Sequence, residues 1–120
     1  MQIGIAVVEQ DDQFLIGQRA ESVVLGGKWE FPGGKVEAGE TPGGAAVREC
    51  WEEAGCRVAV ERLLLVQTEA YDHGTVELHF FLCHPMGVAP VLSPFLWVAR
   101  ADLTNYAFPS GNRKLLELLS

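Results

Sequence analysis

Three glutamates, Glu49, Glu52 and Glu53, are the residues of this 120-residue chain whose type and spacing most clearly favour chemistry. On a helix, positions i, i+3 and i+4 share one face about one turn apart. Three like charges there destabilise the helix by roughly 0.2–0.5 kcal/mol per pair. A Mg²⁺ ion, which takes oxygen ligands from carboxylates, water and substrate phosphates, would offset that repulsion. The spacing therefore predicts a magnesium site, and Mn²⁺ fits the same donors.

Two further charged residues belong to this pattern. Arg48 offsets part of the repulsion, and Glu40, in the preceding loop, is placed either to reach the same metal or to hold Arg48. A single glutamate on a helix surface is usually only solvated. The prediction of a metal site therefore depends on the joint pattern.

A helix is predicted at about Pro42 to Ala54, and it would carry all three glutamates. Thr41 is a good N-cap and Pro42 a good first helical residue. Gly55 fits the position just past the end of the helix.

The remaining chain predicts strands around this helix and a second helix at the end. Ile3–Glu9 is apolar on both faces and is expected to be a central strand. Residues 10–12 are expected to form a turn that joins it to the strand Gln13–Arg19 in a hairpin. Pro32-Gly33-Gly34 is expected to end the third strand. The predicted strands are Ile3–Glu9, Gln13–Arg19, Lys28–Phe31, Arg57–Glu69, Thr75–His84 and Phe95–Val98, with loops at 21–27 and 85–94 and a closing helix from about Ser110. This order predicts a single α+β domain over residues 1–120, with a mixed sheet between helices.

Composition excludes several function classes. The chain has 16 Asp and Glu against 9 Lys and Arg, a net charge of −7, which argues against binding of nucleic-acid polymers. No apolar run approaches the roughly 20 residues of a membrane span, and no basic segment precedes the first apolar residues. The odd set of Cys50, Cys56 and Cys83 is expected to be buried and reduced, as in a cytoplasmic protein.

The segment from Gly34 to Cys56 resembles the signature of the Nudix hydrolases, G-x5-E-x7-R-E-U-x-E-E-x-G-U with U apolar. Its seven fixed positions are filled, a chance match on the order of 10⁻⁸ per starting position. Those positions hold Gly34, Glu40, Arg48, Glu49, Glu52, Glu53 and Gly55. Further segments resemble the MutT-type branch, the nucleoside triphosphate pyrophosphohydrolases. They are Leu15–Arg19, Trp29–Lys35, Trp97–Val98, Phe108–Pro109 and Asn112.

The resemblance implies the Nudix fold, a mixed β-sheet sandwiched between α-helices, and Mg²⁺-dependent cleavage of a nucleoside diphosphate linked to another group. It implies metal ligands at Gly34, Glu49, Glu52 and Glu53, with Arg48 orienting the carboxylates.

The same resemblance implies a set of substrate-binding residues. Arg19 would contact phosphate and Asn112 would read a purine edge through its amide, while Phe31 and Phe108 would also bind substrate. The alternative for Asn112 is an ordinary polar residue in a helix turn capped by Ser110, and for Arg19 a solvated or structural role.

One position departs from the MutT-type pattern. Those enzymes carry an acidic residue where this chain has Leu96, and residues 85–101 contain no Asp or Glu. By resemblance to other Nudix branches, Glu53 is then expected to be the general base. Glu77 and His79 share a strand face and are the other candidates for the site, although solvated or structural roles are commoner for such residues.

The expected activity is Mg²⁺-dependent hydrolysis of a nucleoside triphosphate to the monophosphate and pyrophosphate, with an oxidised purine such as 8-oxo-dGTP as one candidate substrate. CTP, dCTP, nucleotide sugars and dinucleotides stay open as alternatives. A nucleotide-binding sensor that lost hydrolysis is the alternative from another class. The partner expected in each case is a small nucleotide, and the oligomeric state is not readable from one sequence.

Overall fold

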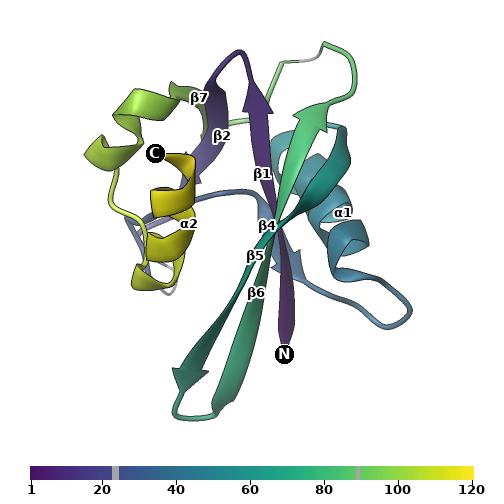
Figure 1. Cartoon of the computed structure of the whole chain (residues 1–120), viewed down its shortest axis with the longest axis vertical. Coiled ribbons are helices and arrows are strands. Elements are labelled where there is room, and N and C mark those ends of the chain that lie inside the picture. The colour runs from purple at the N-terminus through teal and green to yellow at the C-terminus, as the bar shows by residue number, and fades with distance from the viewer. Residues whose placement is uncertain (23–24, 89) are drawn as a thin grey trace.

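A computed structural model describes residues 1–22, 25–88 and 90–120 and shows a strand-rich chain with a helix on either side of the strands (Figure 1). In chain order the elements are β1 (Gln2–Gln10), β2 (Gln13–Gln18), β3 (Trp29–Glu30), β4 (Gly33–Lys35), α1 (Pro42–Ala54), β5 (Val58–Tyr71), β6 (Gly74–Pro85), β7 (Phe95–Ala99), the 3₁₀ segments η1 (Arg100–Asn105) and η2 (Ser110–Asn112), and α2 (Arg113–Leu119). None of the helices in the described part of the chain is long and apolar enough to cross a membrane.

The sheet is mixed, as predicted. Its strand order is β3-β2-β1-β6-β5, with β4 paired to β1 and β7 paired to β2. The β1–β6 pair is parallel, whereas β1 pairs antiparallel with both β2 and β4. The first half of β1 therefore runs between β4 and β6, and its far end turns into the hairpin with β2.

Burial of β1 on both faces explains its continuous apolar run. Ile5 and Val7 belong to the core that includes Leu115 of α2, whereas Ala6 and Val8 belong to the core that includes Cys50 of α1. Successive side chains of a strand point to opposite faces. The sheet is therefore sandwiched between α1 and α2, which confirms the predicted fold class.

Helix α1 has the predicted boundaries. The Thr41 hydroxyl accepts a hydrogen bond from the Gly44 amide at 3.0 Å, and Gly55 ends the helix at φ +65°. The helix lies against β1 so closely that a Cβ on Gly4 would stand 2.1 Å from the Pro42 carbonyl oxygen. This contact fixes the height and direction of the helix relative to the sheet.

Two predicted boundaries were wrong. Gly33 and Gly34 do not end a strand but lie in β4, where Gly34 pairs with Gly4 of β1. The closing α-helix begins at Arg113, after a 3₁₀ turn, and the Ser110 side chain caps neither segment. The two glycines predicted a turn. In the structure Gly33 instead allows β4 to lie close to β1, because a side chain at this position would meet the β1 backbone.

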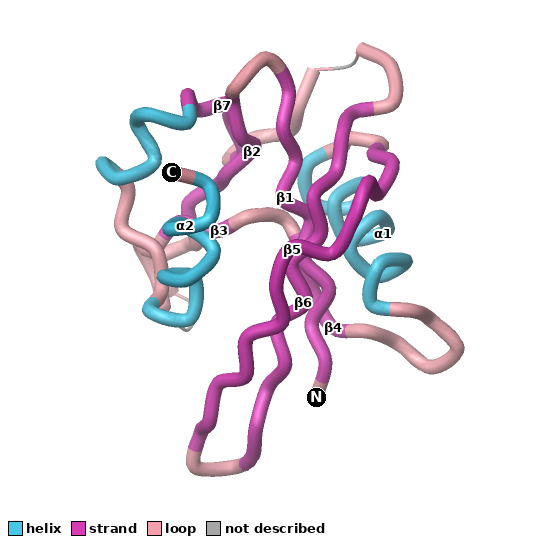
Figure 2. The backbone as a smooth tube through the Cα atoms, viewed as in Figure 1, coloured by secondary structure: helices cyan, strands magenta, loops and turns pink. Residues whose placement is uncertain are grey.

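The two predicted loops are described only in part. Residues 21–22 and 25–27 form turns, while Val23 and Val24 lie outside the described residues, as does Ala89 of the predicted loop 85–94. Pro85 belongs to β6, and η1 was not predicted. Strands β5 and β6 form a long hairpin that extends beyond the other strands (Figure 2). The three cysteines are free and buried, as expected.

Candidate functional site

The carboxylate face of α1 lies against β4. Oε1 of Glu53 accepts a hydrogen bond from the Gly33 amide at 2.9 Å. A Cβ built on Gly34 would stand 2.4 Å from Cδ of Glu49. The absence of a side chain at Gly34 therefore lets the Glu49 carboxylate approach the strand, and two of the three predicted carboxylates meet the same short backbone segment.

Arg48 holds the carboxylates together. Its guanidinium donates to both carboxylate oxygens of Glu40, at 2.7 and 3.0 Å. Its Nη1 donates to Glu49 at 2.7 Å and to Glu52 at 3.0 Å, and its Nη2 donates to the Lys35 carbonyl at 3.1 Å. The bonds that Arg48 donates to Glu40 raise the pKa of Arg48 most, followed by those to Glu52 and Glu49. The same bonds to Glu40 lower the pKa of Glu40. Of the two roles open to Glu40, the structure places it on Arg48.

Glu53 has a different environment from the other two glutamates. Burial raises its pKa to about 7, and the nearby charges of Glu30 and Glu49 act in the same direction. The Gly33 amide and Arg19 oppose this rise. A carboxyl group with a pKa near neutrality can accept a proton from a substrate or a water at ordinary pH.

The donor set fits a divalent cation. It consists of three carboxylates on one face of α1, two of which lie against β4, and oxygen is the ligand that Mg²⁺ prefers. As the side chains are oriented, no three His, Cys, Asp or Glu residues of the described ranges stand as a closed metal site. Arg48 engages Glu49 and Glu52, so an ion would have to share these carboxylates with the guanidinium.

A cavity of about 740 Å³ borders β4, the strand against which Glu49 and Glu53 lie. Its volume is typical of a small-molecule site. Gly33 and Gly34 form part of its wall, and the β5–β6 hairpin and η2 form the opposite part. None of the α1 glutamates lines the cavity itself, which reaches them only through Gly33 and Gly34 of β4.

Several predicted substrate-binding residues line this cavity. Arg19, Phe31 and Asn112 do so, and Arg19 also donates a hydrogen bond to Glu30 at 2.7 Å. Phe108 stacks on Phe31, with ring centroids 5.3 Å apart and planes at 21°. Phe31 lines the cavity but is only 4% exposed, and Phe108 packs against its ring.

Comparison with known proteins decides the family. The NUDIX domain matches residues 4–118, almost the whole chain. The chain belongs to the Nudix hydrolase family.

Individual Nudix relatives resemble the chain over most of its length. The 8-oxo-dGTP diphosphatase of Escherichia coli is 30% identical over a 127-residue alignment that covers 99% of this chain and 95% of that protein. The CTP pyrophosphohydrolase of the same organism is 33% identical over 120 residues, covering 98% and 89%. The crystal structure of a MutT NUDIX hydrolase from Burkholderia pseudomallei superposes with a TM-score of 0.78, at 27% identity, covering 99% and 97%.

The cavity wall does not include Leu96, Glu77 or His79, which the sequence also singled out. Leu96 is in β7, paired with Ile16 of β2 and partly exposed. Glu77 contacts His79 at 3.2 Å, and its cross-strand partner is Thr68. Cross-strand partners share a sheet face, so Glu77 faces away from the side on which its neighbours Val76 and Leu78 line the cavity.

Two acidic residues at the cavity were missed by the sequence reasoning. Glu30 is the ion-pair partner of Arg19, and Glu69 of β5 lines the far wall. The signal for Glu30 was its place in the segment Trp29–Lys35, where it received no role. Glu69 gave no such signal, because its pairing with Val76 and its approach to Gly111 exist only in the folded chain.

Proposed function

We propose that this Nudix hydrolase is a Mg²⁺-dependent nucleoside triphosphate pyrophosphohydrolase that releases a nucleoside monophosphate and pyrophosphate, with an oxidised purine nucleotide such as 8-oxo-dGTP as a substrate. The observation that carries the proposal is the continuity of the cavity with Gly33 and Gly34, against which Glu49 and Glu53 lie. The names of the relatives support the same class of reaction.

Gly34, Glu49, Glu52 and Glu53 are the residues that would hold the ion, Mg²⁺ or Mn²⁺. When bound, such an ion neutralises phosphate charge and lowers the pKa of a coordinated water. Arg48 keeps Glu49 and Glu52 on the side of β4 and so positions them for this role.

Glu53 acts as the general base in this proposal. A water oxygen adds to phosphorus, its proton passes to the Glu53 carboxylate, and the bridging P–O bond to the pyrophosphate leaving group breaks. The raised pKa of Glu53, about 7, suits a group that must take up a proton near neutral pH. Since residues 85–101 contain no Asp or Glu, this chain depends on Glu53 more than a relative with a second acid would.

The nucleotide itself is bound by the remaining predicted residues. Arg19 contacts the phosphates, held in place by its bond to Glu30. Phe31, braced by Phe108, forms part of the cavity wall against which the base would lie, and Asn112 presents an amide that can donate and accept together.

Two other functions compete with this one. Hydrolysis of CTP or dCTP is favoured by the similarity to the CTP pyrophosphohydrolase. A nucleotide-binding sensor without turnover is favoured by Leu96, which stands where MutT-type enzymes carry an acid. Both would be stabilised by ligand, so only product formation separates a sensor from a hydrolase.

The test is product analysis of the purified chain with 8-oxo-dGTP, dGTP, dCTP and CTP, with Mg²⁺ and with EDTA. We expect monophosphate and pyrophosphate only with Mg²⁺, and loss of most turnover in Glu53→Gln. Glu117→Gln, an exposed glutamate of α2, is the control for removal of one charge. Near-normal turnover of Glu53→Gln with a normal melting curve would exclude Glu53 as the base. Binding of nucleotide without any product would favour the sensor or a substrate such as a nucleotide sugar or a dinucleotide.

A further inference from the structure

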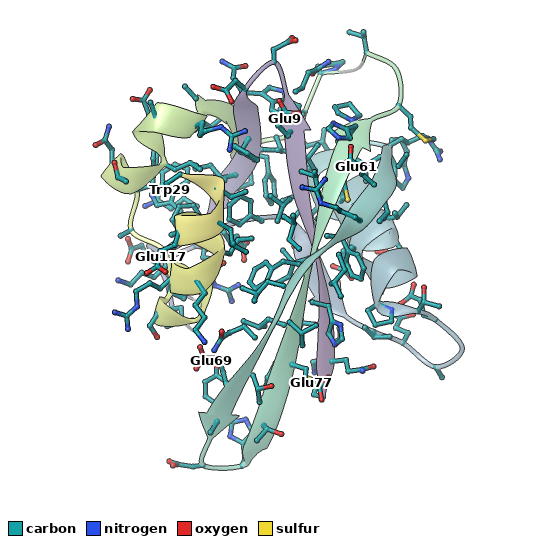
Figure 3. All side chains as sticks on the ribbon, in the orientation of Figure 1. Glu9, Trp29, Glu61, Glu69, Glu77 and Glu117 are labelled. Atoms are coloured by element: carbon teal, nitrogen blue, oxygen red, sulfur yellow. The ribbon has the colours of Figure 1, made fainter. Side chains whose placement is uncertain are left out.

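Glu69 lies at the end of the cavity opposite the α1 carboxylates. It is half-buried in β5 and lines the cavity together with Asn112. A Cβ built on Gly111 would stand 2.8 Å from Oε1 of Glu69, so the carboxylate lies against the residue that precedes Asn112. Figure 3 shows Glu69 beside β5, at the foot of the C-terminal helical segment. The strand and the 3₁₀ turn thus bring an acid and an amide together, 43 positions apart in the sequence.

The Glu69 carboxylate has no hydrogen-bond donor of its own. Among residues 1–22, 25–88 and 90–120, no backbone or side-chain group donates to it, and no cation pairs with it. The cavity wall next to it includes the apolar side chains of Val76, its cross-strand partner, and Leu78. An ionised carboxylate is an acceptor only, with two oxygens that can take two parallel N–H bonds. At this place its donors come from water or from the molecule that occupies the cavity.

The position of Glu69 determines which part of a nucleotide it meets. Phosphates are anions and would be repelled by an unpaired carboxylate, whereas Arg19, near Gly33 and Gly34, attracts them. A nucleotide with its phosphates at Gly34 places its base toward Asn112 and Glu69. The acid therefore faces the edge of the base.

We propose that Glu69 determines base specificity by accepting two hydrogen bonds from adjacent N–H groups, the N1–H and the 2-amino group of a guanine-type base. This inference rests on the proposed function, since it assumes a nucleotide in the cavity. Guanine and 8-oxoguanine present these two donors side by side. Cytosine and adenine place an acceptor nitrogen beside their amino group, and its lone pair would face a carboxylate oxygen. Uracil and thymine offer one N–H between two carbonyl oxygens.

The Glu69 carboxylate would also discriminate between the competing substrates. A site built around an N–H donor discriminates strongly against an analogue that lacks it, because the acceptor is left without a partner. Guanine-type triphosphates should therefore be preferred over CTP and dCTP. The neighbouring amide of Asn112 is left to contact another part of the purine.

The test compares dGTP with dITP, which differs only by loss of the 2-amino group, in the full chain and in Glu69→Ala and Glu69→Gln. We expect kcat/KM of the unchanged chain to be about 10- to 100-fold higher for dGTP than for dITP, the usual range for one hydrogen bond to a charged group. In Glu69→Ala this ratio should fall toward one, through a loss on dGTP expressed mainly in KM. In Glu69→Gln, whose amide offers one donor and one acceptor, the ratio of dGTP to dCTP should fall as well.

Controls separate this inference from its alternatives. Glu61→Gln removes one charge from the same strand, at an exposed position, and should leave every ratio unchanged. Melting curves establish that each variant is folded, and Glu69→Gln keeps the volume if Glu69→Ala does not fold. An unchanged ratio of dGTP to dITP in the folded Glu69 variants would overturn the proposal, as would a preference of the unchanged chain for CTP.

A failure of the proposed function would give a different result. In that case no triphosphate is hydrolysed, and calorimetric titration with dGMP and dIMP tests Glu69 without turnover. Tighter binding of dGMP that disappears in Glu69→Gln supports the assignment even in a protein that does not hydrolyse. Equal binding of the two monophosphates, or no binding of either, overturns it.

Discussion

A methyl group added at Gly34 tests whether the position of Glu49 matters to the site. The Cβ of Gly34→Ala would stand 2.4 Å from Cδ of Glu49 and 2.5 Å from its Oε2. Ordinary contact begins at 3.4 Å, so the carboxyl group must retreat by about 1 Å (3.4 − 2.4). The obstacle is the far end of a flexible side chain on a helix surface, which can move without disturbing β4.

We expect this variant to keep its fold and lose activity. A displacement of about 1 Å at a reacting site can reduce the rate by about 100-fold, equivalent to about 2.7 kcal/mol of transition-state stabilisation. The assay is kcat/KM on the preferred triphosphate at several Mg²⁺ concentrations, with melting followed by circular dichroism. The required Mg²⁺ concentration should rise, because Glu49 is one of the expected ligands.

Two neighbouring glycines serve as matched controls. At Gly43 of α1 an added Cβ would meet only Phe81, at 3.6 Å, so Gly43→Ala should be as active as the unchanged chain and up to about 1 kcal/mol more stable. At Gly33 it would stand 2.6 Å from the backbone oxygen of Gly4, so Gly33→Ala should lose about 1–3 kcal/mol of stability. Full activity of Gly34→Ala at the usual Mg²⁺ concentration would refute the reasoning about Glu49.

Three further predictions concern stability and reactivity. Burial raises the pKa of Glu53 from 4.5 to about 7, so between these pH values, in EDTA, the folded chain keeps a proton that the unfolded chain releases. The free energy of unfolding should therefore fall as pH rises through this interval. Urea unfolding of Glu53→Gln should lack this dependence on pH. Arg100 donates to the Leu119 carbonyl at 2.6 Å, so Arg100→Ala should lower the unfolding free energy by about 1–2 kcal/mol, and an unchanged urea midpoint would contradict this. A hydrogen bond from Cys50 lowers the pKa of Cys56, whereas burial raises that of Cys83 to about 12, so iodoacetamide at pH 8 should label Cys56 first; mass spectrometry of the peptides would reveal any other order.

The fold was predictable where local chemistry and long-range packing agree. Thr41, Pro42 and Gly55 favour the two ends of one helix whatever the rest of the chain does, and the structure keeps both boundaries. The prediction was wrong at Gly33 and Gly34, because two glycines favour a turn locally. Their actual role, pairing with β1 at close range, depends on residues far earlier in the chain: Gly34 pairs with Gly4, 30 positions before it.

The site divides in the same way. The carboxylates of α1 follow from helical spacing, which is a local property, and the structure places two of them together at β4. Glu69 could not be assigned from spacing, because its meaning depends on η2, which approaches it from the other end of the chain. Asn112 was assigned only through resemblance, and its 3₁₀ turn was read as the first turn of an α-helix.

The charges of the cavity are arranged asymmetrically, and this asymmetry orients a nucleotide. At the Gly34 end Arg48 donates to Glu49 and Glu52 of α1, and Arg19 donates to Glu30. At the other end no cation of the described residues pairs with Glu69, which lines the cavity together with the stacked Tyr71 and His73. Because the chain has a net charge of −7, a polyphosphate is attracted only to a region where positive side chains lie together. A base with N–H donors is stabilised where it meets a hydrogen-bond acceptor such as Glu69. In the proposed complex, the same distribution of charge that brings the phosphates toward the α1 end would therefore present the base to Glu69.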